Sequence, residues 1–230
     1  MAKILAMMGT DTEVGKTYVS CLLMRALDRA GIRVAAFKPL ESGCPLVAGV
    51  LNPEDSQALG QAGGGRQTID EINVYRFQEP VAPGIAAALE GVMIDWARIN
   101  QRLLRLTQQY DLVVLEGAGG LLVPLGGGET WLSWLPTISA EIGVILVGRN
   151  RLGTINHTLL SLEALDRRGL QVIGVYLNSL DQEARPGQDL DTAFIEDIGN
   201  KPILDIIGRH QTSLTIPSAL QDWLNSGSRG

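Results

Sequence analysis

The stretch GTDTEVGKTYVS, which begins at Gly9, contains the residues of a phosphate-binding loop at an unusual spacing. The common form of this loop has four residues between its two glycines and ends in Gly-Lys-Ser or Gly-Lys-Thr. Here five residues separate Gly9 from Gly15, and Thr10 stands where the first glycine is usual. Lys16 and Thr17 nevertheless keep their places. We therefore expect Lys16 to reach the β- and γ-phosphates of a nucleotide and Thr17 to bind Mg²⁺.

The residues on either side of the loop favour a nucleotide site over a chance match. An apolar run at 3–8 predicts a strand before the loop, and apolar residues at helical spacing predict a helix over 15–30. The free N–H groups of residues 13–17 would then face phosphate oxygens, where the helix dipole favours anions. The alternative is that Gly-Lys-Thr merely starts a helix. The extra residue enlarges the loop and leaves room for a second ligand beside the γ-phosphate.

Three charged residues stand where such a site needs them. Lys38 follows a predicted strand at 34–37, and Glu116 ends an apolar strand at 112–116. In parallel sheets, ligands gather at the carboxyl ends of strands. A buried carboxylate needs a cation as its partner, so Glu116 indicates a lysine or a bound magnesium ion. Asp55 lies in NPEDSQAL, which is typical of a helix start, so capping alone explains it.

Short apolar strands alternate with amphipathic helices along the chain. The predicted strands are 3–8, 34–37, 112–116, 143–148, 172–178 and 202–207. The predicted helices are 15–30, 94–110 and 154–168, and 45–70 is predicted as a loop with one short helix near 56–61. This alternation predicts an α/β fold of the P-loop NTPase type, with a mostly parallel sheet covered by helices on both faces. Because no linker or repeat interrupts it, we expect a single domain over residues 1–230.

The composition is that of a globular protein with a net charge of −6. The absence of a basic tract argues against nucleic acid as a partner. No uncharged apolar run is long enough for a membrane span, so we expect no membrane partner. Cys21 and Cys44 form no Cys-x-x-Cys pair and no disulfide framework. We therefore expect reduced thiols and a cytoplasmic protein.

Four stretches of the chain together resemble the dethiobiotin synthetases. They are GTDTEVGKT at 9–17, KPLESG at 38–43, EGAGGLLVPL at 116–125 and LGTINHTLL at 152–160. The resemblance implies an ATP- and Mg²⁺-dependent cyclo-ligase that forms C–N bonds. In that reaction 7,8-diaminononanoate (diaminopelargonate) takes up CO₂ as a carbamate. ATP converts the carbamate to a carbamic–phosphoric anhydride, and the neighbouring amine closes the ureido ring of dethiobiotin with release of ADP and phosphate.

The resemblance also implies a role for individual residues. The catalytic residues implied are Lys38, Lys16 and Thr12, and the metal ligands implied are Thr17, Asp55 and Glu116. The nucleotide-binding residues implied are Glu13, Val14, Gly15, Lys16, Thr17, Tyr18, Asp55, Glu116, Gly117, Ala118, Gly119, Asn178, Ser179, Gly208, Arg209 and His210, with Asn178 reading adenine. The substrate contacts implied are Ser42, Gly153, Thr154 and Asn156. The last three are expected to face the substrate carboxylate at the interface of a homodimer.

The chain departs from the family pattern at three places. Gly84 stands where histidine is frequent, and Arg149 and Arg151 make VGRNRLG more basic than usual. The sequence LDIIGRHQ replaces a Gly-x-Ile-Pro run near the last strand. The departures concern recognition of the base and of the substrate tail.

Two other classes of protein share parts of this pattern. Nucleotide-switch ATPases of the MinD and ParA type share the fold, but they carry a second lysine near the start of the loop. This chain has Thr10, Asp11 and Thr12 there, and LQDWLNSGSRG at 220–230 is a short and weakly basic end. Amidating cobyrinate synthetases need a further glutamine-hydrolysing domain, for which this chain is too short.

Overall fold

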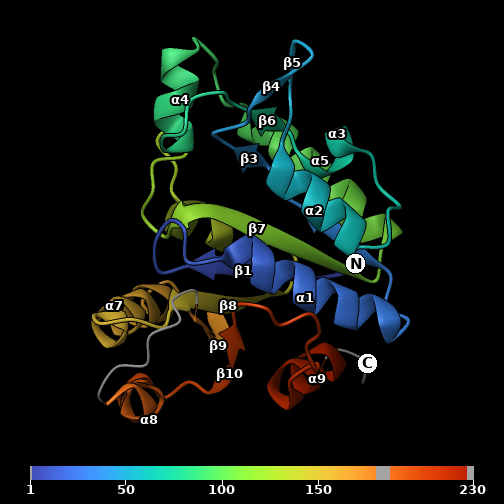
Figure 1. Ribbon diagram of the computed structural model, residues 1–230. Coiled ribbons are helices and arrows are strands. Elements are labelled where there is room, and N and C mark those ends of the chain that lie inside the picture. The colour runs from blue at the N-terminus through green and yellow to red at the C-terminus, as the bar shows by residue number, and fades with distance from the viewer. Residues whose placement is uncertain (1, 180–186, 227–230) are drawn as a thin grey trace.

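The computed structural model describes residues 2–179 and 187–226 (Figure 1). Its centre is a six-stranded sheet in the order β10-β9-β8-β1-β7-β2, and all five strand pairs are parallel. The strands are β1 (Lys3–Gly9), β2 (Val34–Phe37), β7 (Leu112–Gly120), β8 (Ile142–Arg149), β9 (Gln171–Ser179) and β10 (Ile203–Gly208). The predicted fold class is confirmed, and each of the six predicted strands is present to within a few residues.

Helices cover both faces of this sheet, and a separate hydrophobic core lies under each face. One face packs against α1 (Lys16–Arg29), α2 (Glu54–Ala62), α3 (Ile69–Ile72) and α9 (Ser218–Asn225). The other packs against α5 (Trp96–Gln109), α6 (Trp131–Trp134) with the 3₁₀ turn Leu135–Thr137, α7 (Thr154–Asp166) and α8 (Gln188–Gly199). The central strands are therefore buried on both sides, which explains their continuous apolar sequences.

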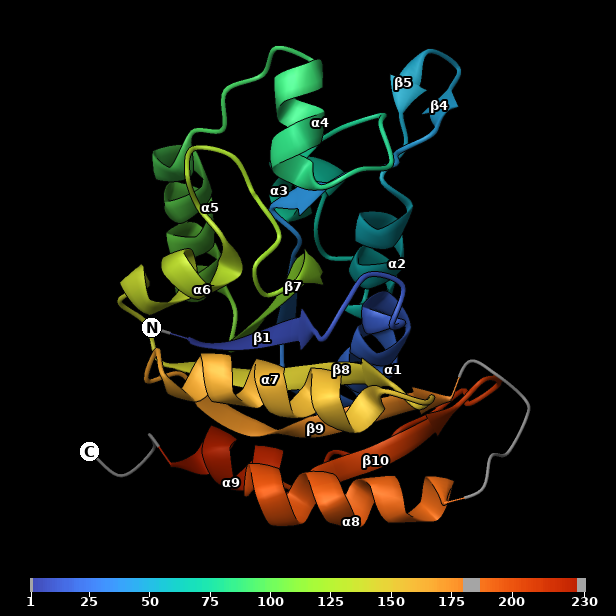
Figure 2. The ribbon, with the colours of Figure 1, turned by 90° about the vertical axis from the view of Figure 1, so that its left-hand side faces the viewer.

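A smaller group of elements stands beyond the six-stranded sheet. It consists of α4 (Pro83–Leu89), the parallel pair β3 (Leu40–Glu41) and β6 (Tyr75–Arg76), and the hairpin of β4 (Leu46–Val47) and β5 (Val50–Leu51). Figure 2 shows α4 and this hairpin together, well above the sheet. The chain reaches the group directly after β2, the edge strand of the sheet, through Lys38 and Pro39. Lys38 is thus held at the point where the chain leaves the sheet.

Several boundaries differ from the sequence predictions. The prediction that Glu116 ends its strand is wrong, because β7 continues to Gly120 and Glu116 pairs in register with Met7. The segment 45–70 contains the β4–β5 hairpin and a helix that begins at Glu54, earlier than predicted. The helices α3, α4, α6, α8 and α9 are absent from the predictions. None of the helices in the described part of the chain combines the length and hydrophobicity needed to cross a membrane.

Candidate active site

The phosphate loop joins β1 to α1 and is shaped by glycine at both ends. Gly15 adopts a left-handed backbone conformation with φ of 83°, and Glu13 does so with φ of 56°. The ammonium group of Lys16 folds back over the loop and donates to the carbonyl of Asp11 at 3.1 Å. A Cβ atom at Gly9 would lie 2.7 Å from Lys16 Nζ. The glycine that makes room for the lysine therefore stands one residue earlier than in the common motif, and the longer spacing preserves the cradle.

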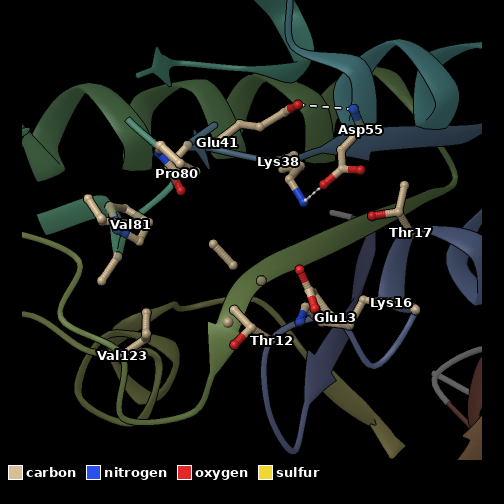
Figure 3. Close-up of a pocket in the computed structure, with 17 residues that line it drawn as sticks. Thr12, Glu13, Lys16, Thr17, Lys38, Glu41, Asp55, Pro80, Val81 and Val123 are labelled. Atoms are coloured by element: carbon tan, nitrogen blue, oxygen red, sulfur yellow. Dashed lines mark hydrogen bonds and ion pairs between the residues drawn. The ribbon is translucent and has the colours of Figure 1, made fainter. Parts of the chain in front are cut away.

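Four side chains from four separate elements converge beside this loop, and we call them the charge cluster: Thr17, Lys38, Asp55 and Glu116. Lys38 Nζ lies 2.7 Å from Glu116 Oε1 and 2.8 Å from Asp55 Oδ2. The Thr17 hydroxyl donates to the same Glu116 oxygen at 2.7 Å. Figure 3 shows Lys38 and Asp55 facing each other across the top of the loop. Residues far apart in sequence thus meet at one point.

Burial and charge together set the protonation of these groups. Burial alone would lower the pKa of Lys38, but attraction to Glu116 and Asp55 outweighs burial and holds that pKa above its usual value. Burial would raise the pKa of Asp55, but attraction to Lys38 holds it below its usual value. The pKa of Lys16 is lowered to about 8 by burial, and repulsion from Lys38 adds to the shift. An anion placed between Lys16 and Lys38 would therefore interact favourably with both positive charges.

The charge cluster also has the chemistry of a magnesium site. Glu116 is fully buried, and its second oxygen, Oε2, has no hydrogen-bond partner. Mg²⁺ prefers oxygen ligands and is usually held by one or two carboxylates together with water and substrate phosphates. Among the described residues, no group of three or more His, Cys, Asp or Glu is arranged to hold a metal. The residues thus fit an ion that arrives with a nucleotide better than a metal site made of protein ligands alone.

A cavity of about 670 Å³ opens beside the charge cluster. Its polar side carries the two lysines and Thr12, and apolar side chains of Pro80, Val81 and Val123 form the other side (Figure 3). Ser42 also lines the cavity. Other predicted residues in its lining are Glu13, Gly15, Thr17, Asp55, Gly117, Ala118 and Gly119. The cavity suits a molecule with polar groups at one end and a hydrocarbon chain.

Comparison with known proteins agrees with this geometry. A family model described as an AAA domain matches residues 3–213. The ATP-dependent dethiobiotin synthetase of Anaeromyxobacter dehalogenans (strain 2CP-C) is 41% identical over 86% of this chain and 86% of its own length. The enzyme of that name from Anaeromyxobacter sp. (strain K) is 43% identical over 81% of each chain. The chain belongs to the dethiobiotin synthetase family.

A solved structure places this family in a wider fold group. The ParA family ATPase from Chlorobium tepidum TLS has a TM-score of 0.53 and 15% sequence identity, and the match covers 99% of this chain and 90% of that one. Identity this low shows a shared fold alone. Membership of the dethiobiotin synthetase family rests on far higher identity, so the alternative of a MinD/ParA-type switch is not supported.

The residues expected to bind the nucleotide base lie outside the cavity, on the far side of the phosphate loop. Asn178, at the end of β9, donates through Nδ2 to the Val14 carbonyl at 3.0 Å, and its buried Oδ1 has no partner. Ser179 accepts a hydrogen bond from Asn150 at 2.9 Å. The Tyr18 hydroxyl lies within hydrogen-bonding distance of the carbonyls of Gly208, Arg209 and Gln211, and His210 is exposed beside them. Tyr18 thus ties α1 to the loop after β10.

The structure does not bring the family's fourth motif into the cavity of the same chain. Gly153 has φ of 93° and precedes the first turn of α7. Thr154 lines a small recess against Thr10 and Asp11, and its buried Oγ1 has no hydrogen-bond partner. Asn156 is exposed on the helix surface. Within one chain, these residues and Lys38 face different spaces.

No role is predicted from the sequence for one buried residue of the site, Glu41. Glu41 lines the cavity and is 4% exposed. Its carboxylate accepts hydrogen bonds from the backbone N–H of Asp55 at 2.9 Å and of Ser56 at 3.0 Å. The only signal in the sequence is a carboxylate next to Leu40 in KPLESG, and the partners lie at least 14 residues further along the chain.

The glycine found in place of the family's frequent histidine has a local explanation. A Cβ atom at Gly84 would lie 2.6 Å from the backbone N of Gly126 and 2.9 Å from the carbonyl oxygen of Pro124. Gly84 N–H also donates to that carbonyl at 2.9 Å. In this chain α4 and the loop after β7 therefore pack backbone against backbone.

Proposed function

We propose that this protein makes dethiobiotin from 7,8-diaminononanoate, CO₂ and ATP, and releases ADP and phosphate. The observation that carries this proposal is the charge cluster with Lys16 on one side of a cavity, in a chain of the dethiobiotin synthetase family. Such a reaction needs cations at the point where two anions, a carbamate and a γ-phosphate, must meet.

The chemistry divides into three steps that the site can support. An amine of the substrate loses a proton and adds to CO₂, which forms a carbamate. A carbamate oxygen attacks the γ-phosphorus, and the bond to ADP breaks. The second amine attacks the carbonyl carbon and loses a proton, and phosphate leaves with the oxygen that came from CO₂. The cavity supplies proximity by holding both amines and the phosphate together.

Lys16 and Lys38 stabilise different anionic groups. We assign Lys16 to the β- and γ-phosphates, because it lies over the loop at the start of α1. We assign Lys38 to the carbamate and the γ-phosphate, because it lines the cavity, as Ser42 does, and faces Thr12 across it (Figure 3). Lys38 is paired with two carboxylates in this structure, so it must exchange at least one of them for the reacting anions.

Thr17, Asp55 and Glu116 would hold the Mg²⁺ ion that accompanies ATP. When bound, the ion neutralises charge on the β- and γ-phosphates and supplies Lewis-acid stabilisation of the transferring group. The free Oε2 of Glu116 supports this assignment, and so does the position of Asp55 at the cavity wall. Before the nucleotide arrives, Lys38 pairs with both Asp55 and Glu116 and offsets part of their negative charge.

Binding of the adenine base is assigned to the region beyond the loop. We propose that Asn178 reads the base through its free Oδ1, while its Nδ2 stays on the phosphate loop. Ser179 and the segment 208–210, which Tyr18 holds against α1, would flank the base. These groups lie at the carboxyl ends of β9 and β10, where ligands bind in sheets of this type.

The substrate carboxylate requires a second copy of the chain. The amines belong near Lys38 and Ser42, and the apolar residues 80–83 would contact the hydrocarbon chain. The N-terminus of α7 has a positive dipole, which suits a carboxylate, but it faces away from the cavity of its own chain. We therefore propose a homodimer in which Gly153, Thr154 and Asn156 of one chain complete the site of the other.

The state of the two cysteines bears on the cell compartment. Cys21 and Cys44 are both free and buried in the structure. Thiols that remain unpaired are usual in a reducing compartment. We propose that the protein acts in the cytoplasm.

A substrate-omission assay tests the proposed function. ADP formation is measured with ATP, Mg²⁺, the diamine and bicarbonate, and then with each component left out in turn. The proposal predicts rapid ADP formation only when all four are present, with dethiobiotin formed in equal amount. ADP formation that is indifferent to the diamine and bicarbonate would instead indicate a nucleotide switch.

A further inference from the structure

The helix that carries Asp55 begins without a cap of its own. The residue at the N-cap position of α2 is Pro53, which has no side-chain hydrogen bond to the first turn. Helix N-termini leave free N–H groups that a side chain at this position normally accepts. The N–H groups left over in the first turn of α2 include those of Asp55 and Ser56, the second and third residues of the helix.

A distant carboxylate supplies the missing acceptor. Glu41 Oε1 accepts from Asp55 N–H at 2.9 Å, and Glu41 Oε2 accepts from Ser56 N–H at 3.0 Å. The Ser56 hydroxyl donates to Oε2 as well. Glu41 is 4% exposed and Ser56 is fully buried, so water does not replace these bonds. Figure 3 shows the contact between Glu41 and the backbone of Asp55 at the rim of the cavity.

The short segment that carries Lys38 and Glu41 therefore holds Asp55 in two ways. Lys38 stands at the end of β2, and Glu41 follows it in β3 after the rigid Pro39. Lys38 fixes the side chain of Asp55, while Glu41 fixes its backbone. The Asp55 side chain is itself 46% exposed and would be free to swing toward solvent without these contacts.

We propose that Glu41 is a positioning residue, which caps α2 from the neighbouring β3 and so aims the Asp55 carboxylate at Lys38 and at the cation of the nucleotide. The proposal rests on the proposed function only in taking Asp55 as a ligand of that cation. Glu41 does not act on the substrate in this account, because donors of the protein occupy both of its oxygens. A purely structural cap would stabilise the fold and leave cation binding unchanged.

The test measures cation binding directly, with Mn²⁺ as a probe in place of Mg²⁺. Electron paramagnetic resonance titrations give the dissociation constant of Mn²⁺ for the protein saturated with ADP. The variant Glu41→Gln removes the charge and one acceptor, and Ser56→Ala removes one donor. The matched control is Asp95→Ala, because Asp95 caps α5 by accepting from the N–H groups of Ala97 and Arg98 at 2.9 and 3.2 Å.

We expect Glu41→Gln to weaken Mn²⁺ binding by roughly 10-fold to 100-fold, as is typical when the partner that orients a metal ligand is lost. Ser56→Ala should weaken it by roughly twofold to tenfold, the usual effect of one lost hydrogen bond. Asp95→Ala should lower the melting temperature and leave Mn²⁺ affinity at the wild-type value.

Equal melting losses in Glu41→Gln and Asp95→Ala, with wild-type Mn²⁺ affinity in both, would overturn the proposal. If Glu41→Gln does not fold, Ser56→Ala decides: weaker Mn²⁺ binding supports the proposal and unchanged binding overturns it. The assay contains no diamine, so its outcome is independent of turnover. A wild-type protein that makes no dethiobiotin, but whose variants weaken Mn²⁺ binding as expected, would refute the proposed function and leave the role of Glu41 standing.

Discussion

Replacing Lys38 by glutamine should show how much the charge of Lys38 contributes to the stability of the ligand-free protein. Lys38 and Glu116 have side chains that are 4% and 0% exposed, and their charged atoms lie 2.7 Å apart. Removing one partner of a buried ion pair leaves the other charge without compensation and typically costs about 3–5 kcal/mol. The lower end applies here, because Thr17 still donates to Glu116 and Asp55 is 46% exposed to water.

The expected loss in the free energy of unfolding is therefore about 3 kcal/mol at neutral pH. For a chain of this size each kcal/mol shifts the melting temperature by about 2–4 °C, so we expect a decrease of roughly 6–12 °C. Arg33→Gln is the matched control. Its pair with Asp111 also spans 2.7 Å but is 61% and 45% exposed, and such surface pairs contribute about 0–1 kcal/mol.

The loss should depend on pH in a defined direction. The folded-state pKa of Asp55 is lowered, so its contribution to stability is present above the unfolded pKa of about 3.9 and is lost as the pH falls through the folded pKa. The folded-state pKa of Lys38 is raised, so its contribution is present below about 10.4 and is lost as the pH rises through the folded pKa. Lys38→Gln removes the contribution of Lys38 and the part of the Asp55 contribution that comes from Lys38. The difference in stability between wild type and variant should therefore be constant between about pH 5 and 8 and change outside that window, because Lys16, which Lys38 repels, has a pKa of about 8.

Urea unfolding of both proteins across this pH range, with and without millimolar Mg²⁺, measures the effect. Mg²⁺ should stabilise Lys38→Gln more than wild type, because the variant presents two carboxylates without their lysine. A deficit that stays the same at every pH and is indifferent to Mg²⁺ would show that only packing was lost. That result would refute the electrostatic reasoning.

Three further substitutions test other parts of the site. Gly9→Ala should weaken ATP binding by roughly tenfold or more in calorimetry, because the new Cβ displaces the Lys16 ammonium and its hydrogen bonds; wild-type affinity would contradict this. Asn156→Ala should raise the KM for the diamine and leave that for ATP nearly unchanged, whereas a fully active monomer in light scattering at assay concentration would exclude the shared site. Gly84→Ala should lower the free energy of unfolding by about 1–3 kcal/mol through its clash with Gly126, and an unchanged thermal melt would argue against that close contact.

The sheet was predictable because its strands are buried on both faces. Such strands are continuous apolar runs, and the glycine-containing segments after β1 and at the end of β7 mark where ligands approach. The end of β7 was not predictable, because a polar Glu116 interrupts the apolar run while the backbone ladder continues to Gly120. Hydrogen bonding of the backbone does not depend on the polarity of the side chain.

The helix α8 is absent from the predictions although its sequence carries a helical pattern. Leu190, Phe194 and Ile198 recur every fourth residue, which is the spacing that predicts a helix. In the structure these three side chains are exposed, and of the 12 residues of α8 only Asp191 and Ile195 are buried. The helix packs against α7 and the edge strand β10.

In the site, local contacts were predictable and distant ones were not. Lys16 and Thr17 follow from the loop motif, and topology places Lys38, just after β2, next to Glu116 in the neighbouring strand β7. The sequence around Asp55 indicated only a helix start. Its helix is capped by Glu41. This contact depends on how the chain returns after the β4–β5 hairpin, so no local sequence pattern predicts it.

The origin of the oxygen in the released phosphate tests the central claim most directly. Bicarbonate labelled with oxygen-18 is mixed with the protein, ATP, Mg²⁺ and the diamine in unlabelled water, and phosphate is analysed by mass spectrometry before the label exchanges with water. A carbamate that attacks the γ-phosphate must leave one of its oxygens in the product phosphate, so we predict labelled phosphate and dethiobiotin in matching amounts. Phosphate without the label, released while the diamine is consumed, would mean that water attacks ATP and would contradict the account.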